Sequence, residues 1–194
     1  MLQNILLIIG AYLLGSIPTG LLLAKSAGVD IRNSGSGNIG ATNVYRTLGR
    51  NIGILTLVGD CLKGLIPVLV AKRLGLADTV IAAVGAAAFL GHVYTLFLRF
   101  KGGKGVATAL GVFLGVSPPS VGIAVAIFIA VVASRRYISL GSIIAAGVIP
   151  FLIAGLDRRP PIIVMSVVIS LLVIWKHKEN ITRLRAGTEN KFKA

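Results

Sequence analysis

Long apolar stretches, many of them about as long as a bilayer-spanning helix, recur along this chain of 194 residues. A hydrocarbon core of about 30 Å requires about 20 apolar residues of helix. Hydrophobic residues make up 55% of the sequence and charged residues only 13%, a composition that excludes a water-soluble domain of this size. The sequence therefore predicts an all-α, polytopic integral membrane protein with a single domain over residues 1–194.

Breakers divide the apolar residues into seven runs. The runs cover residues 2–24, 51–71, 77–98, 105–116, 119–134, 138–155 and 161–175. The fourth and fifth are short, and the fourth would rise only about 18 Å as a helix, less than the thickness of a bilayer. These two runs either form separate helices around a hairpin at residues 117–119 or join as one helix kinked at Pro118 and Pro119.

Positive charges decide between six crossings and seven, because cytoplasmic loops are enriched in Lys and Arg. With six crossings, the basic residues divide about evenly between the two sides. With seven, most basic residues lie on one side, and the other side holds only Lys72, Arg73, Arg158 and Arg159. We therefore predict seven transmembrane helices, two of them short, with the N-terminus outside and the C-terminus in the cytoplasm.

This topology places three polar, basic, glycine-rich segments on the cytoplasmic side. The first covers residues 33–50 and reads NSGSGNIGATNVYRTLGR. Glycine lets the backbone approach an anion closely, and hydroxyl, amide and guanidinium groups add donors. We expect an anion site formed by Ser36, Gly37, Asn38, Gly40, Thr42, Asn43 and Arg46. The alternative is a flexible, solvated linker.

The second segment is FKGGKG, residues 100–105, at the predicted start of a helix. Helix-start amides and two lysines beside glycines are suited to phosphate. The candidate residues are Lys101, Gly102, Gly103, Lys104 and Gly105. The segment lacks the G-x-x-x-x-G-K-[ST] spacing, so ATP hydrolysis is unsupported. The alternative is a basic stop at the membrane edge.

The third segment is HKENITRLRAGTE, residues 177–189. His177 and Asn180 are three residues apart, so on a helix they share a face and an imidazole and an amide can meet one substrate. The alternative is that His177 is an interfacial residue. Ser139 and Ser142 either bond their own backbone, the favoured interpretation, or reach the site, and Ser142 is kept as a candidate substrate ligand.

Ionisable residues also occur inside the apolar runs. Asp60 and Lys63 are three apart and are expected to pair, because an isolated charge in a membrane is costly. His92 has no carboxylate near it in the sequence and is expected to be a packed or interfacial histidine. Cys61 is the only cysteine, which excludes a disulfide, and nothing in the sequence indicates a metal or organic cofactor.

Taken in order, SGNIGATNVYRTLG, GHVYTLFLRFKGGKGVAT and HKENITRLRAGTE resemble the motifs of the bacterial acyl-phosphate:glycerol-3-phosphate acyltransferase family. The sequence GSIPTG at residues 15–20 and Asp60, Lys63 and Gly64 are similar as well. The resemblance implies a multi-pass enzyme of the bacterial inner membrane whose active site faces the cytoplasm. It would move a fatty acyl group from acyl phosphate to the sn-1 hydroxyl of glycerol 3-phosphate, giving lysophosphatidic acid and phosphate in the first step of phospholipid synthesis.

The resemblance also implies that neither acyl-CoA nor acyl carrier protein is the donor. The sequence is consistent with this, because it lacks the His-x-x-x-x-Asp pair of soluble-type glycerolipid acyltransferases: Phe97 follows His92 and Thr182 follows His177 at that spacing. An acyl phosphate already has a good leaving group, so direct transfer without a covalent acyl-enzyme is expected.

In this hypothesis Lys104 and its neighbours hold a phosphate, His177 deprotonates the hydroxyl, and Asn180 orients the imidazole or the glycerol. Alternatively, the donor's own phosphate takes the proton. The expected partners are the two substrates and membrane lipid, with no nucleic acid. A transporter of a small phosphorylated anion is the rival function, and a scaffold that binds anionic lipid is a third. The transporter is disfavoured because the chain has no internal repeat and its anion-binding groups gather on one side.

Overall fold

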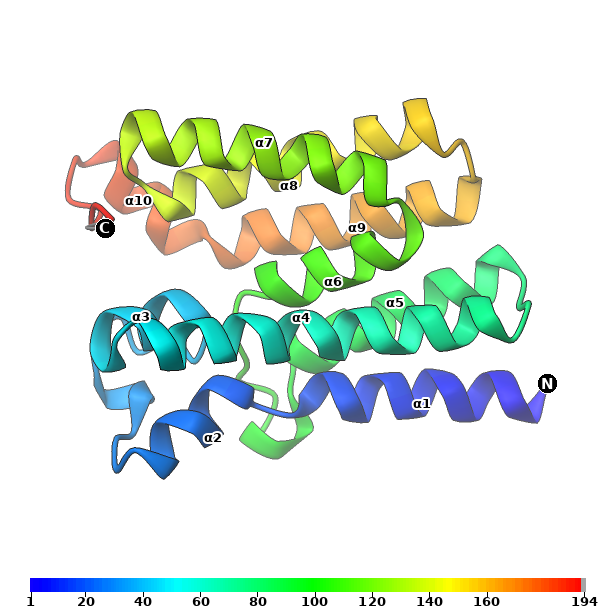
Figure 1. Ribbon diagram of the computed structural model, residues 1–194, viewed down its shortest axis with the longest axis horizontal. Coiled ribbons are helices and arrows are strands. Elements are labelled where there is room, and N and C mark those ends of the chain that lie inside the picture. The colour runs from blue at the N-terminus through cyan, green and yellow to red at the C-terminus, as the bar shows by residue number, and fades with distance from the viewer. Residues whose placement is uncertain (193–194) are drawn as a thin grey trace. The chain divides into compact units, whose positions relative to one another are not determined.

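The computed structural model describes residues 1–192, which form helices, turns and loops with no β-strand among them. The chain divides into two compact units, Met1–Val116 and a second that begins at Ser117 (Figure 1). The all-helical class predicted from the sequence is confirmed. The prediction of a single domain over residues 1–194 stays a prediction.

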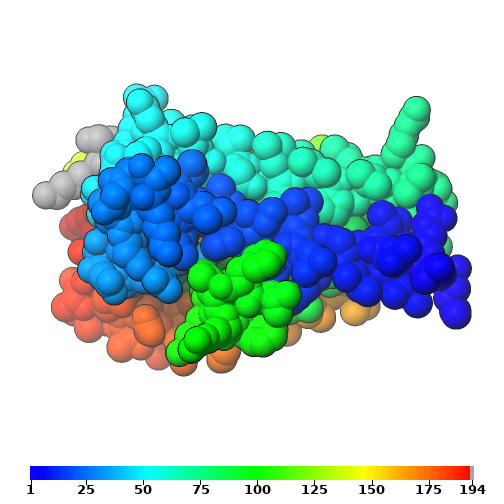
Figure 2. Space-filling view, turned by 90° about the horizontal axis from the view of Figure 1, so that it is seen from below, coloured from blue at the N-terminus to red at the C-terminus, as the bar shows by residue number. Residues whose placement is uncertain are grey.

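The first unit contains six α-helices and two 3-10 turns. They are α1 (Leu2–Ser16), α2 (Thr19–Ser26), η1 (Ile31–Asn33), α3 (Ala41–Leu48), α4 (Arg50–Arg73), α5 (Asp78–Val93), η2 (Leu96–Leu98) and α6 (Val106–Val116). The helix α1 packs along α5, while α4 packs along α6 and against α3. Figure 2 shows the surface segment near residue 100, in green, lying against the N-terminal helix in blue, and η2 contacts α1.

Glycines bring these helices unusually close together. A methyl group added to Gly15 on α1 would overlap the main-chain oxygen of Ala88 on α5. One added to Gly111 on α6 would overlap that of Cys61 on α4. Lipid supplies no hydrophobic driving force between helices, so membrane proteins gain contact through small residues that let backbones approach. The two main helix pairs of this unit are packed in that way.

The second unit consists of α7 (Pro118–Arg135), α8 (Ile138–Leu156), α9 (Pro160–Lys176) and α10 (Lys178–Arg185). The helix α8 packs against both α7 and α9, and α10 contacts α8 and α9 (Figure 1). Between α9 and α10 the chain bends by 55°, at His177. The bend carries the short polar helix away from the axis of the apolar one.

Each of the last six apolar runs contains one α-helix close to its predicted position, and the first contains two. The break at Ser117 separates α6 from α7, so these runs are two helices and not one kinked helix. Within residues 1–192, five helical stretches are long and apolar enough to cross a bilayer: Leu2–Ser26, Arg50–Arg73, Asp78–Leu98, Pro118–Arg135 and Ile138–Leu156. The helix α9 reaches that measure only together with α10, and α6 is 11 residues long. The count of seven crossings and the sidedness of the termini therefore stay predictions.

The sequence pattern missed two features of the first unit. The first apolar run is broken between α1 and α2, where Pro18 restricts Ile17 to an extended backbone conformation. The polar segment at residues 33–50, expected to be a loop, contains the helix α3. The helix α3 has only 8 residues and many of them are polar, so it lacks the long apolar run that identifies the other helices.

Candidate functional site

The first glycine-rich segment is organised around the side chain of Asn43, which is buried. Its Oδ1 accepts a hydrogen bond of 2.9 Å from the Ser36 amide. Its Nδ2 donates to three carbonyl oxygens, those of Ile31, Ser34 and Asn38, at 3.3, 3.0 and 2.9 Å. One amide side chain thereby ties together η1, the turn at residues 34–38 and the start of α3. The segment is an ordered loop and not a flexible linker.

An apolar cluster underlies this loop. Its buried members are Leu21, Ala24, Ile31, Ile39 and Val44, and Leu48, Ile52 and Leu98 pack against it. Ile39 and Val44 come from the glycine-rich segment, while Leu98 belongs to η2, just before the FKGGKG segment. The same cluster therefore brings the first two predicted segments together within the first unit.

Several loop amides donate within the loop itself. The Gly37 amide donates to the Ser34 carbonyl at 3.0 Å, and the Gly40 amide donates to Asn38 Oδ1 at 2.8 Å. With the Ser36 amide bound to Asn43, these amides do not form the row of anion donors that the sequence suggested. The backbone has positive φ at Gly35 and Gly37, which explains the glycines as turn residues. The exposed candidates on this loop are the side chains of Ser36 and Arg46.

Arg32, just before this loop, is held by a neighbouring carboxylate. Its guanidinium forms hydrogen bonds of 2.9 and 2.5 Å with Asp30, and its amide donates to the same side chain. These hydrogen bonds lower the pKa of Asp30 to about 2. The charge of Arg32 is therefore locally compensated.

The FKGGKG segment is packed against the end of α5. The Gly102 amide donates to the Val93 carbonyl at 3.1 Å and the Gly103 amide to the His92 carbonyl at 3.2 Å. These two amides are thus engaged by the protein. They precede α6, so the prediction that amides at the helix start bind phosphate stays a prediction. The glycines serve close packing, because a methyl group on Gly102 would overlap the His92 main-chain oxygen.

The backbone just before these glycines is strained. Arg99 and Phe100 have φ values of 51° and 62°, in the left-handed region that non-glycine residues rarely adopt. The Phe100 amide donates to the Thr95 carbonyl at 2.9 Å and the Lys101 amide to the Leu98 carbonyl at 3.0 Å. These two bonds stabilise the turn at Arg99 and Phe100. Strain of this kind costs about 1–3 kcal/mol per residue and clusters at functional sites. It supports the prediction that this segment is functional.

In the third segment, His177 lies at the bend between α9 and α10 and is buried. Its Nδ1 lies 2.7 Å from the Val173 carbonyl oxygen. A carbonyl only accepts, so Nδ1 carries the hydrogen and Nε2 is the basic nitrogen of the neutral ring. The bend replaces the continuous helical face predicted for His177 and Asn180, although the Ile181 amide still donates to the His177 carbonyl.

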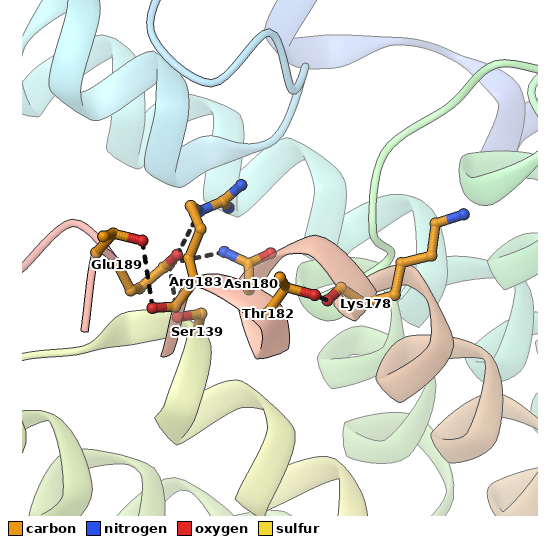
Figure 3. Close-up of polar contacts among 7 residues, drawn as sticks. Ser139, Lys178, Asn180, Thr182, Arg183 and Glu189 are labelled. Atoms are coloured by element: carbon orange, nitrogen blue, oxygen red, sulfur yellow. Dashed lines mark hydrogen bonds and ion pairs between the residues drawn. The ribbon is translucent and has the colours of Figure 1, made fainter. Parts of the chain in front are cut away.

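Glu189 is a residue that the sequence interpretation did not select. Its Oε1 accepts hydrogen bonds of 2.8 Å from Ser139 Oγ and 2.7 Å from Asn180 Nδ2. Its Oε2 accepts a hydrogen bond of 2.7 Å from Arg183 Nε (Figure 3). This carboxylate joins α8, α10 and the segment after α10. Only the position of Glu189 at the end of a family-like motif could have marked it in the sequence.

The Glu189 contacts also assign the two serines of α8. Ser142 Oγ donates to the Ile138 carbonyl at 2.9 Å, as the backbone-bonding interpretation predicted, and its role as a substrate ligand stays a prediction. Ser139 bonds Glu189 and not its own backbone. Burial alone would raise the pKa of Glu189, but the hydrogen bonds from Arg183, Asn180 and Ser139 outweigh it and lower the pKa.

Asp60 and Lys63 pair as predicted, with Lys63 Nζ 2.8 Å from Asp60 Oδ1. His92 is packed, as predicted, but a carboxylate distant in the sequence lies beside it. Its Nδ1 lies 3.7 Å from Asp60 Oδ1, because packing of α5 against α4 joins residues that are far apart in the chain. Across residues 1–192, no group of three or more His, Cys, Asp or Glu residues is placed to hold a metal ion.

The sequence matches the family of glycerol-3-phosphate acyltransferases over residues 5–187. Glycerol-3-phosphate acyltransferases of Geobacter metallireducens and Geobacter sulfurreducens are 74% and 69% identical to it over 194 residues, covering all of both chains. The crystal structure of PlsY, an integral membrane glycerol 3-phosphate acyltransferase, is similar in its glycerol 3-phosphate form with a TM-score of 0.95 at 45% identity, covering 98% of this chain and 96% of that one. The lysophosphatidic acid form gives a TM-score of 0.93 at 44% identity, with the same coverage.

The helices and these likenesses define a multi-pass integral membrane acyltransferase. The chain belongs to the glycerol-3-phosphate acyltransferase family, as its three motifs suggested.

We predict that Glu189→Gln destabilises the second unit. The amide cannot keep both the Arg183 ion pair and the bonds from Ser139 and Asn180, and a lost hydrogen bond to a charged group costs about 1.5–3 kcal/mol. The measurement is the thermal unfolding midpoint in detergent. Glu179→Gln is the matched control, because Glu179 is exposed on α10, the helix that Glu189 contacts, and its change is expected to stay within about 0.5 kcal/mol.

The sign of the pH dependence follows from the lowered pKa of Glu189. Its stabilisation is complete above the ordinary pKa of 4.5 and is lost as the pH falls through the depressed pKa of the folded protein. The difference in unfolding midpoint between wild type and Glu189→Gln should therefore shrink on acidification. Equal midpoints of the two proteins at neutral pH would contradict the role assigned to this carboxylate.

Proposed function

We propose that the protein transfers a fatty acyl group from acyl phosphate to the sn-1 hydroxyl of glycerol 3-phosphate, releasing lysophosphatidic acid and inorganic phosphate. The observation that carries this proposal is the family match over almost the whole chain. The two PlsY structures are named for their glycerol 3-phosphate and lysophosphatidic acid forms, which correspond to the acceptor and the product of this reaction. The reaction would be the first step of phospholipid synthesis.

The presence of two basic segments that could each bind a phosphate supports acyl phosphate as the donor. Both substrates carry a phosphate, and the first unit offers two adjacent basic segments that Leu98 links through the apolar cluster. In the transfer, the hydroxyl oxygen bonds to the acyl carbon, the bond from that carbon to the phosphate oxygen breaks, and the phosphate leaves with the electron pair. No covalent intermediate is needed, because phosphate is already a good leaving group.

The candidate residues divide into two kinds in this proposal. Ser36, Arg46 and Lys104 supply side-chain donors and positive charge toward substrate phosphate, with Asn38, Thr42 and Lys101 beside them. Asn43, Gly102 and Gly103 shape the loops that carry these donors, because their own polar atoms are engaged by the protein. Charged donors fixed in place before the substrate arrives stabilise the charge that develops on the leaving phosphate.

We predict turnover when purified protein in detergent or lipid receives acyl phosphate and glycerol 3-phosphate. The expected readout is release of one phosphate for each lysophosphatidic acid formed. Acyl-CoA in place of acyl phosphate should give no product, because the phosphate-binding segments would have no matching leaving group. Arg46→Ala is expected to lower kcat/KM by about 10²-fold. Turnover with acyl-CoA at a comparable rate would refute the assigned donor.

His177 is the candidate general base. Its Nδ1 is oriented by the Val173 carbonyl, which leaves Nε2 as the basic nitrogen. Asn180 Nδ2 donates to Glu189, and this bond fixes the side chain that we propose to orient the imidazole or the glycerol. The alternative base is a phosphate oxygen of the donor, in which case His177 binds substrate without taking the proton.

The variant His177→Ala separates these two roles. If His177 is the base, kcat should fall by about 10²-fold to 10⁴-fold. The test is the steady-state rate at saturating concentrations of both substrates, with the unfolding midpoint as a check of folding. A fall in kcat of only a few-fold would assign the proton to the donor phosphate.

The proposed topology has seven crossings, the N-terminus outside and all three segments on the cytoplasmic side of the bacterial inner membrane. Exposed Trp175, with the ammonium groups of Lys176 and Lys178 5.7 and 5.6 Å from its ring centroid, is typical of a membrane interface at the end of α9.

Cysteine labelling tests the topology on a Cys61→Ser background, which removes the only native thiol. A membrane-impermeant thiol reagent should reach cysteines at Ser36, Lys101 and Glu179 only from the cytoplasmic side. Cysteines at Arg73 and Arg158 should react only from the other side. Labelling of Ser36 and Glu179 from opposite sides would contradict the proposed topology.

A further inference from the structure

A buried charge cluster lies outside the three glycine-rich segments. It consists of Asp60 and Lys63 on α4 and His92 on α5, whose side chains are 3%, 4% and 3% exposed. Lys63 Nζ lies 2.8 Å from Asp60 Oδ1 and donates a hydrogen bond of 2.8 Å to the Ile17 carbonyl, at the break between α1 and α2. The same Asp60 oxygen lies 3.7 Å from His92 Nδ1.

The opposite edge of the His92 ring faces the FKGGKG segment. A methyl group placed on Gly103 would overlap His92 Nε2, so the ring packs directly on the main chain of that glycine. The Gly103 amide also donates to the His92 carbonyl at 3.2 Å. Both the ring and the main-chain carbonyl of His92 thus contact Gly103, the residue before Lys104.

A buried ion pair between Asp60 and Lys63 is a costly way to stabilise helix packing. Desolvating a buried charge costs several kcal/mol, and replacing a buried pair by packed apolar residues is often neutral or stabilising. Asp60 and Lys63 both lie on α4, so their ion pair by itself does not connect two helices. The Asp60 carboxyl group, however, also faces the His92 ring of α5, and that ring contacts the FKGGKG segment at Gly103. The cluster therefore connects the break at Ile17 to the segment that carries Lys104.

We propose that the Asp60–Lys63–His92 cluster positions the FKGGKG segment for substrate phosphate. Lys63 holds Asp60, Asp60 orients the His92 ring, and the ring fixes Gly103 and with it the direction in which Lys104 leaves the main chain. The inference rests on the proposed function, because it treats this segment as phosphate-binding. The three residues are positioning residues, since none of them is assigned a contact with the reacting atoms.

The primary test is His92→Ala. Loss of the ring opens space beneath Gly103, so Lys104 is no longer held in one direction. We expect the KM of one substrate, the one whose phosphate this segment binds, to rise by about tenfold or more while kcat changes less. Thr56→Val is the matched control, because Thr56 is fully buried on α4 and its hydroxyl bonds the Ile52 carbonyl of its own helix. Both KM values of the control should stay within about twofold of wild type.

Two further variants separate positioning from a general loss of packing. Gly103→Ala forces a methyl group against the ring and should raise the same KM, and that penalty should be clearly smaller in a His92→Ala background, where the overlap is gone. Asp60→Asn combined with Lys63→Met removes both charges together, so no unpaired charge is left buried. The double variant should reproduce the KM effect of His92→Ala in protein that remains folded.

Tryptic cleavage after Lys101 and Lys104 reports on the segment without any substrate. It should be about fivefold faster in His92→Ala than in wild type or Thr56→Val, because opening of the segment admits the protease. If wild type shows no turnover, the proposed function fails while the cleavage rates still decide on positioning. Wild-type KM values and wild-type cleavage rates in both His92→Ala and the Asp60/Lys63 double variant would overturn the inference.

Discussion

Irregular backbone beside a bilayer has to find its hydrogen bonds within the protein, because lipid offers none. The first unit meets this requirement with side chains from neighbouring helices. Lys63 donates to the Ile17 carbonyl, Thr95 to the Ser16 carbonyl at 2.5 Å, and Tyr12 to the Tyr94 carbonyl at 2.7 Å. Because each of these bonds joins segments far apart in the chain, the break in α1 and the end of α5 are fixed together. Asn43 does the same for the carbonyls of the loop before α3.

This requirement changes how the glycines are understood. In the sequence they suggest a backbone shaped to wrap an anion, yet several of their amides already donate within the protein. Glycine is needed at Gly102 and Gly103 because the main chain there lies so close to the end of α5 that a side-chain methyl group would not fit. The anion-binding capacity of the loops therefore depends on the side chains that they hold, with rigid backbone beneath them.

Much of the fold could be predicted because apolar length is a local property. The runs at residues 51–71 and 138–155, for example, differ from α4 and α8 by at most two residues at each end. The pairing of Asp60 with Lys63 was predictable for the same reason, since three residues bring side chains together on one helix. The break at Ile17 was visible only as Pro18, and a proline near a helix end permits either outcome.

The residues that were missed depend on tertiary contacts. His92 approaches Asp60 only because α5 packs on α4, and Glu189 reaches Ser139 only because the chain turns back after α10. No periodicity connects positions separated by 32 or 50 residues. The helix α3 escaped detection because it is short and only a few of its residues, among them Val44 and Leu48, are apolar, too few to stand out among polar neighbours.

An activated donor changes what an enzyme has to provide. When the leaving group is already good, the remaining barrier lies largely in holding two anionic substrates so that a hydroxyl meets a carbonyl carbon, and alignment alone can supply about 7–11 kcal/mol of that barrier. Two like-charged ligands also repel each other, so the groups that neutralise them have to be fixed before the ligands arrive. The hydrogen bonds by which Asn43 and Glu189 hold their segments, and the positioning that we propose for the Asp60–Lys63–His92 cluster, are the kind of fixed polar groups that the proposed reaction would require.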